Sequence, residues 1–222
     1  MAKFTHVCSY DRAGYGWSDP GSEPRTTSQI SRELKALLGA AGEKGPFILV
    51  GHSFGGFIVR VFTHLYPTDV AGVVFVDASH EDEDDRINAL LPEAIRQQER
   101  KADEWNTKVN RVMNPLGLFF GIQRFEVKMG WAGSSHLSQQ LRQQLFYLRQ
   151  QPKSRQAIAS ESAAWTQSVA EVRASGSLGD RPLIVLTAGK PYDRDPLLSN
   201  EQMERQNDFM DSRFAGPRSA AI

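Results

Sequence analysis

The sequence is short of three things: cysteine, net charge and long apolar runs. Cys8 is the single cysteine among 222 residues, so no disulfide forms within the chain, and a reducing, cytoplasmic location is expected. Cys8 lies in an apolar segment, where a buried thiol is the ordinary expectation. Lys and Arg together number 26, as do Asp and Glu, which leaves no excess positive charge for a nucleic acid.

The longest apolar runs, such as residues 71–76, are far shorter than the roughly 18 residues of a membrane-spanning helix. The first residues also lack the apolar stretch of a secretory signal. We therefore expect a soluble protein without a nucleic-acid or membrane partner. At this length, about 70% of the surface of the unfolded chain can be buried, so the size of the chain requires neither a disulfide nor a metal.

Apolar runs of strand length alternate with helical periodicity over the first 80 residues. Residues 4–10 are β-prone and end in a glycine-rich turn. Residues 47–50 are apolar throughout, and the run at 70–77 is apolar up to its last residue, Asp77. Between these runs, apolar residues recur at helical spacing over 28–41 and 57–65. Strands that do not alternate, separated by helices, predict a parallel sheet covered on both faces, and hence an α/β fold.

Residues 81–179 interrupt this rhythm with helical patterns and no strand between them. An apolar strand returns at 182–187, and a polar helix is predicted from Glu201 to about Asp211. We therefore divide the chain into a first part of the core (1–80), an inserted helical region (81–179) and a second part of the core with a polar tail (180–222).

The segment Gly51-His52-Ser53-Phe54-Gly55 matches G-x-S-x-G and lies between a predicted strand and a predicted helix, as in a nucleophile elbow. An elbow holds its serine in a strained turn, and the two flanking glycines are expected to remove side chains that would collide. We predict Ser53 as the nucleophile and the amide of Phe54 as a donor to the oxyanion. The alternative is an ordinary glycine-rich strand-to-helix turn, such as one that binds phosphate, although neither the dinucleotide fingerprint nor a P-loop lysine is present.

Three segments together resemble the α/β-hydrolase fold family: Tyr10-Asp11-Arg12-Ala13-Gly14-Tyr15-Gly16-Trp17-Ser18-Asp19, residues 51–56 and Val76-Asp77-Ala78-Ser79-His80. The resemblance covers most of the chain outside the helical insert. It implies an eight-stranded sheet, of which this chain would supply the fourth to seventh strands. It also implies that residues 81–179 form a helical cap over a Ser-Asp-His site that hydrolyses an ester or a similar small acyl substrate without a cofactor.

Two parts of the family pattern are missing from the sequence. A histidine-glycine loop that donates the second oxyanion amide would lie before residue 1. The family's catalytic histidine follows the last strand, whereas all the histidines here precede residue 182: His6, His52, His64, His80 and His136. We expect a chain truncated at both ends, with a gap in the sheet and exposed strand edges that favour self-association.

The remaining site residues have alternatives. The acid is expected to be Asp193, just past the late strand, or Asp77, at the end of the strand at 70–77; either aspartate could instead form a turn or a cap. His80, which follows a strand's carboxyl end, and His136, in the insert, are candidate substitute bases. Either would have to come within hydrogen-bond distance of Ser53.

A serine hydrolase is therefore the leading interpretation, and a non-catalytic fragment or interaction protein is its rival. A dehalogenase-like relative is less favoured, because that chemistry needs a carboxylate where Ser53 stands. The acidic run at 80–85 lacks the spaced ligands of a calcium loop and is better explained as a helix N-terminus. No metal or cofactor is expected.

Overall fold

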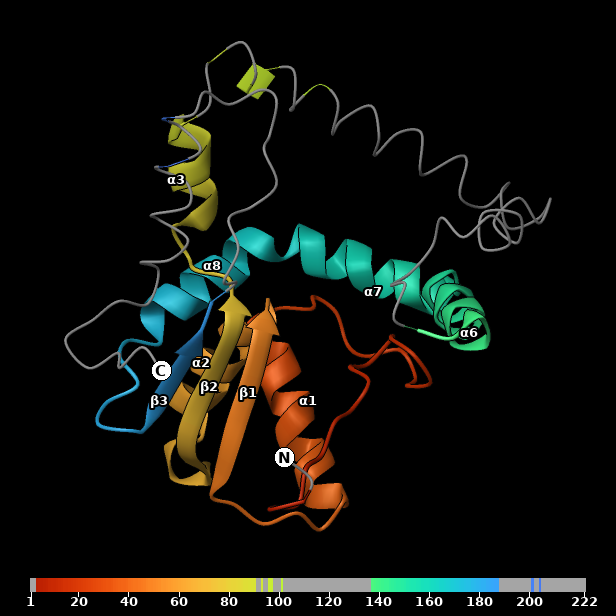
Figure 1. Ribbon diagram of the computed structural model, residues 1–222, viewed down its shortest axis with the longest axis vertical. Coiled ribbons are helices and arrows are strands. Elements are labelled where there is room, and N and C mark those ends of the chain that lie inside the picture. Colours follow the sequence, from red (N-terminus) through yellow and green to blue (C-terminus); the bar gives the residue numbers. More distant parts are fainter. Residues whose placement is uncertain are drawn as a thin grey trace.

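The computed structural model describes residues 3–90, 93, 96–97, 101, 137–187, 201 and 204. Within these residues, three parallel strands form one sheet in the order β1-β2-β3 (Figure 1). Strand β1 spans Phe47–Ser53, β2 spans Val70–Ala78 and β3 spans Leu183–Leu186. The predicted α/β class is confirmed, and so are the three predicted apolar strands of the sheet.

Two helices follow from local sequence signals. Helix α1, Thr27–Ala40, begins where the hydroxyl of Thr26 accepts a hydrogen bond from the Gln29 amide. Helix α2, Gly55–Leu65, begins directly after β1 and ends before Pro67, which cannot continue a helix. A short 3-10 helix, Pro67–Asp69, then leads into β2. Both α1 and α2 lie behind the sheet in Figure 1.

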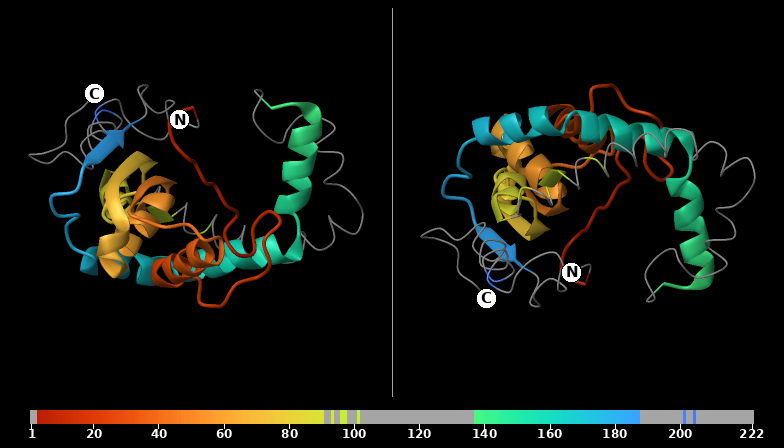
Figure 2. Two further views of the ribbon diagram at one scale, coloured as in Figure 1. Left: turned by 90° about the horizontal axis from the view of Figure 1, so that it is seen from below. Right: turned by 90° about the horizontal axis from the view of Figure 1, so that it is seen from above.

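Four helices of the region after β2 are described: α3 (Glu83–Leu90), α6 (Gln139–Arg149), α7 (Pro152–Ala163) and α8 (Trp165–Ala174). Helices α7 and α8 run one after the other past the carboxyl ends of the strands, and α6 lies at the end farther from the sheet (Figures 1 and 2). Most of the predicted helix from Glu201 onward lies outside the described residues. Among the helices that are described, none has the length and apolar character needed to cross a membrane.

The core lies on the face of the sheet that α2 covers. Buried side chains from α2 and β2 form its main cluster: Val59, Phe62, Val70, Val73, Phe75 and Ala78. A second cluster joins α2 to α8 through Phe57, Val61 and Val172. Burial of apolar surface at about 25 cal/mol per Å² makes these clusters the main source of stability.

The opposite face of the sheet is open, so the prediction of two covered faces is wrong for the described part of the chain. Ile48 is 69% exposed and Val50 is 51% exposed, and Ile184 and Leu186 are also exposed. The reason is that α1, which precedes β1, and α2, which connects β1 to β2, both lie on the other face. The described helices therefore bury only one of the two apolar faces of these strands.

The predicted strand at residues 4–10 is also wrong, because these residues form no strand. Phe4 is 90% exposed, and Cys8 is exposed rather than buried. A strand requires a neighbour that pairs with its amide and carbonyl groups, and no segment among the described residues pairs with this one. A β-prone composition alone therefore does not make a segment a strand.

Candidate active site

Ser53 is the last residue of β1 and occupies a left-handed backbone conformation with φ of 50°. This region is unfavourable for any residue that carries a Cβ. The Ser53 carbonyl accepts a hydrogen bond of 3.1 Å from the Ser79 amide, which fastens the turn to the end of β2. Ser53 is exposed, and α2 begins two residues later. The turn has the strained strand-to-helix geometry that the sequence predicts, and the role of Ser53 as nucleophile stays a prediction.

The glycines of the turn differ in how much space a side chain would have at each position. A Cβ at Gly51 would lie 2.6 Å from the Gly55 carbonyl oxygen, and one at Gly56 would lie 2.5 Å from the Ala78 Cβ. At Gly55, nothing described lies within 4 Å of such a Cβ. Gly51 and Gly56 therefore let α2 approach the strands. The expectation that Gly55 avoids a collision is wrong for the described residues, because its missing side chain would point into open space.

Phe54 lies between Ser53 and α2 with helical φ and ψ. Its amide donates to no group in the described part of the chain, so it is available to a ligand at Ser53. The Phe54 ring lies 5.9 Å from the Phe57 ring and 5.7 Å from the Trp165 ring. These contacts connect the residue after the serine to both α2 and α8.

Of the two candidate acids, Asp77 lies near the carboxyl end of β2 and Asp193 lies outside the described residues. Asp77 is half-buried and has a φ of 42°. Asp77 is therefore, after Ser53, the second non-glycine residue with a left-handed backbone conformation in the described part of the chain. Because β1 and β2 are parallel neighbours, both residues lie at the same edge of the sheet.

His80 is half-buried, and its Nδ1 accepts a hydrogen bond of 3.1 Å from the Asp82 amide. Burial lowers its pKa, although the nearby carboxylates of Glu81 and Asp82 oppose this. The neutral ring in this arrangement carries its proton on Nε2. No histidine of the described chain is hydrogen-bonded to the Ser53 hydroxyl, and His136 lies outside the described residues.

The acidic residues after His80 are paired with arginines. Glu81 forms a bidentate ion pair with Arg60, which lowers the Glu81 pKa although burial alone would raise it. Asp82 lies 2.9 Å from Arg173, and the hydrogen bond between them lowers the Asp82 pKa. These carboxylates hold α2 and α8 beside the start of α3.

One group of metal-ligating side chains is present in the part of the chain that the structure describes: His6, Cys8 and Glu43. The His6 Nε2 lies 3.7 Å from the Cys8 Sγ, and the His6 Nδ1 lies 3.6 Å from the Glu43 carboxylate. Opposite sides of one imidazole therefore face the two partners. The group includes none of the candidate catalytic residues.

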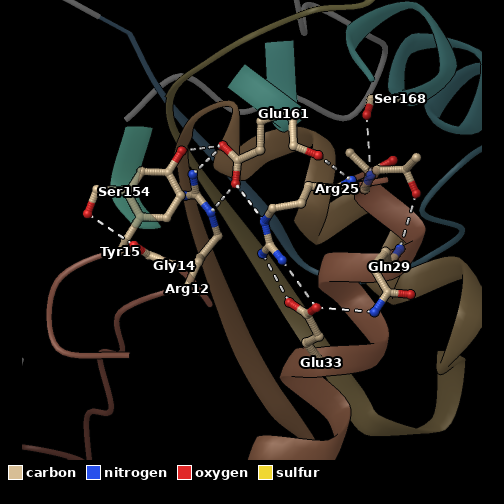
Figure 3. Close-up of polar contacts among 12 residues, drawn as sticks. Arg12, Gly14, Tyr15, Arg25, Gln29, Glu33, Ser154, Glu161 and Ser168 are labelled. Carbon is tan, nitrogen blue, oxygen red and sulfur yellow. Dashed lines mark hydrogen bonds and ion pairs between the residues drawn. The ribbon is translucent and has the colours of Figure 1, made fainter. Parts of the chain in front are cut away.

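A partly buried ion-pair network, which no pattern in the sequence indicates, joins α7 to the loop after residue 10 (Figure 3). Glu161 of α7 accepts hydrogen bonds of 3.2 and 2.8 Å from Arg12 and of 2.7 Å from the Tyr15 hydroxyl. The buried Arg25 lies 3.8 Å from Glu161 and forms a bidentate pair with Glu33. Arg12 and Glu161 are 149 residues apart, so no local pattern could reveal their contact.

The protonation states suit this network. Burial, and then the hydrogen bond to Glu161, raises the pKa of Tyr15 to about 12, so its phenol stays protonated and donates. Burial alone would lower the pKa of Arg12, but the contact with Glu161 outweighs this and raises it. Arg12 therefore stays protonated, and Tyr15 stays neutral, at neutral pH.

The same loop also packs closely against α7. Ser154 donates a hydrogen bond of 3.0 Å to the Gly14 carbonyl. Gly14 has φ of 87°, and a Cβ there would lie 2.6 Å from the Ala157 Cβ. Ser154, Ala157 and Glu161 share one face of α7, because their spacing follows the helical repeat. This face of α7 is fixed to the loop.

Comparison with known proteins agrees with this architecture. A family model described as the alpha/beta hydrolase fold matches residues 5–209. A Schizosaccharomyces pombe protein, named as uncharacterized, is 40% identical over 74 residues, which are 33% of this chain and 14% of the relative. An AB hydrolase superfamily protein of Gibberella zeae is 39% identical over 79 residues, which are 34% of this chain and 24% of the relative.

These alignments span only a small part of each relative. Among solved structures, Cfl2 of Burkholderia cenocepacia superposes with a TM-score of 0.57 at 19% identity, covering 89% of this chain and 67% of that one. This similarity concerns the fold. The family model, in contrast, covers all three strands of the sheet and the helices between them. The chain belongs to the α/β-hydrolase fold family.

Proposed function

We propose that this chain is a serine hydrolase that acts on carboxylic esters or similar small acyl substrates without a cofactor. One observation carries the proposal: Ser53 is held at φ of 50° between β1 and α2, beside the unengaged amide of Phe54. A strained residue of this kind costs of order 1–3 kcal/mol, and such residues cluster at functional sites. The same strain at Asp77, on the neighbouring strand, supports a site at this edge of the sheet.

In the proposed reaction, the Ser53 hydroxyl attacks the acyl carbonyl while a base removes its proton. The carbonyl oxygen becomes negative and accepts a hydrogen bond from the Phe54 amide. The alcohol leaves with a proton from the base, and water then hydrolyses the acyl-serine by the same steps. Asp77 or Asp193 would orient the base and stabilise its protonated form.

The candidate bases are His80 and His136. His80 lies after β2 at the correct edge of the sheet, but the nitrogen that could accept a proton is engaged by the Asp82 amide. His80 would have to turn, or His136 would have to supply the base. This arrangement supports a second candidate function, in which the chain keeps the elbow but acts as a non-catalytic binding or interaction protein.

Residues 81–179 are proposed to form the cap over the substrate. Helices α7 and α8 pass the carboxyl ends of the strands, where α/β proteins bind their ligands (Figure 1). A small acyl compound is the proposed partner, and the open face of the sheet supports self-association as well. The single cysteine, which is exposed and free, supports a cytoplasmic location.

The test is labelling of the folded protein with a fluorophosphonate probe, followed by peptide mass spectrometry. We expect modification at Ser53 in the wild type and none in Ser53→Ala, because the probe requires an activated serine. His80→Ala and His136→Ala, compared with His64→Ala as a control, would then identify the base. No modification of a wild-type sample that is demonstrably folded would favour the non-catalytic function.

A further inference from the structure

The ring of Phe54 has two neighbours, each of which is held by a carboxylate. The Arg12 guanidinium lies 5.9 Å from the centre of the Phe54 ring. The Trp165 ring lies 5.7 Å away, and its indole N–H donates a hydrogen bond of 2.7 Å to Asp84. Arg12 is held by Glu161. The residue after the proposed nucleophile therefore contacts one segment that precedes the helical insert and one segment that belongs to it.

Glu161 is the stronger of the two anchors. Its side chain is 11% exposed, and it binds Arg12 through two charge-assisted hydrogen bonds, which are among the strong ones in proteins. Figure 3 shows Glu161 reaching from α7 to Arg12 and Tyr15. Without its carboxylate, Arg12 would lose its ion-pair partner, whereas Arg25 would keep Glu33. The direction of the Arg12 side chain thus depends on Glu161, together with the Tyr15 ring, whose centre lies 4.6 Å from the guanidinium.

We propose that Glu161 is a positioning residue for the elbow. It holds Arg12 near the ring of Phe54 and so, together with the backbone hydrogen bonds of the turn, limits the directions in which the Phe54 amide points beside Ser53. The catalytic consequence rests on the function proposed above, whereas the positioning of Phe54 does not. Helix α7 then has two roles: it forms part of the proposed cap, and through Glu161 it positions Arg12 beside Phe54.

The direction of the amide matters because an oxyanion donor acts over a narrow range. It must lie about 2.7–3.1 Å from the position that the negative oxygen takes, not from the ground-state carbonyl. Phe54 precedes α2, and its amide is therefore free of the helical hydrogen bonds that would hold it. The Ser53 carbonyl, which shares a planar peptide group with this amide, is held by the Ser79 amide, and the Phe54 carbonyl accepts from the Phe57 amide. Contacts of the Phe54 side chain add to these backbone hydrogen bonds.

Glu171 offers a matched control. It is also a carboxylate of the helical region that binds the core, since it accepts hydrogen bonds of 2.5 Å from the Thr27 hydroxyl and 2.7 Å from the Ser28 amide. These partners lie at the start of α1 and do not include Arg12 or Phe54. We expect Glu161→Gln to slow fluorophosphonate labelling of Ser53 by roughly 10- to 100-fold, and Glu171→Gln to leave it near the wild-type rate.

Hydrogen exchange separates this inference from the proposed function. We expect the amides of residues 53–57 to exchange about tenfold faster in Glu161→Gln and to be unchanged in Glu171→Gln. If the wild type takes no label, the hydrolase proposal fails and this exchange pattern still tests the positioning of Phe54. Equal exchange and equal labelling in the two variants would overturn the inference.

A milder variant covers the case in which Glu161→Gln does not fold. Tyr15→Phe removes one hydrogen bond to Glu161 and keeps the pair with Arg12. We expect it to fold and to slow labelling by about two- to fivefold, with a matching rise in exchange at 53–57. Wild-type behaviour of Tyr15→Phe in both measurements, together with loss of folding in Glu161→Gln, would reduce Glu161 to a stability role and contradict the inference.

Discussion

The two faces of the sheet are made from the same kinds of residue but differ in exposure. Val73 and Phe75 are 2% and 1% exposed on the face toward the helices, whereas Ile48 and Val50 are 69% and 51% exposed on the other face. The strands therefore do not determine their own burial, and the helices α1 and α2 decide it. Stability and the elbow should both depend on the covered face, because the elbow joins β1 to α2.

The largest expected effect comes from removing a side chain on the covered face. Phe75→Ala should lower the free energy of unfolding by about 3–5 kcal/mol, since it leaves a cavity between the sheet and α2. Ile48→Ala, on the open face, should cost within about 1 kcal/mol, because little apolar surface is lost from the core. Urea unfolding monitored by circular dichroism would measure both values. Equal losses would show that the open face is covered by something else.

A smaller effect sharpens the same comparison at the elbow. Gly51 faces α2, and Gly51→Ala places a methyl group 2.6 Å from the Gly55 carbonyl oxygen, so we expect a loss of about 1–3 kcal/mol. Gly55→Ala meets no described atom within 4 Å and should be neutral or should stabilise α2 by up to about 1 kcal/mol. Thermal unfolding of the two variants would distinguish them. A destabilised Gly55→Ala would contradict the geometry of the turn.

The parts of the fold that the sequence predicts correctly are those with local causes. The strand at Phe47, the turn at Ser53 and the helix that stops before Pro67 follow from apolar runs, glycine spacing and the missing amide of proline. The errors have distant causes. Residues 4–10 have the composition of a strand but depend on a neighbour elsewhere in the chain, and the open face depends on where the helices pack.

The candidate site divides in the same way. Ser53 and Phe54 could be identified from five consecutive residues, and the position of Asp77 followed from the end of an apolar run. The contact of Glu161 with Arg12 could not, because it joins segments 149 residues apart and each residue alone looks like an ordinary surface charge. Charged residues that become buried through distant partners leave no periodic signal in a sequence.

The smallest expected effect on stability concerns the open face. Ile48→Lys should change the free energy of unfolding by less than about 0.5 kcal/mol, because this side chain already meets solvent. It should nevertheless shift the protein toward the monomer in light scattering at high concentration, since a lysine on an exposed strand opposes pairing between copies. Ile158→Lys is the control: the same substitution is made at an isoleucine of α7 that is 46% exposed. If neither variant changes the molar mass, the open face does not mediate self-association.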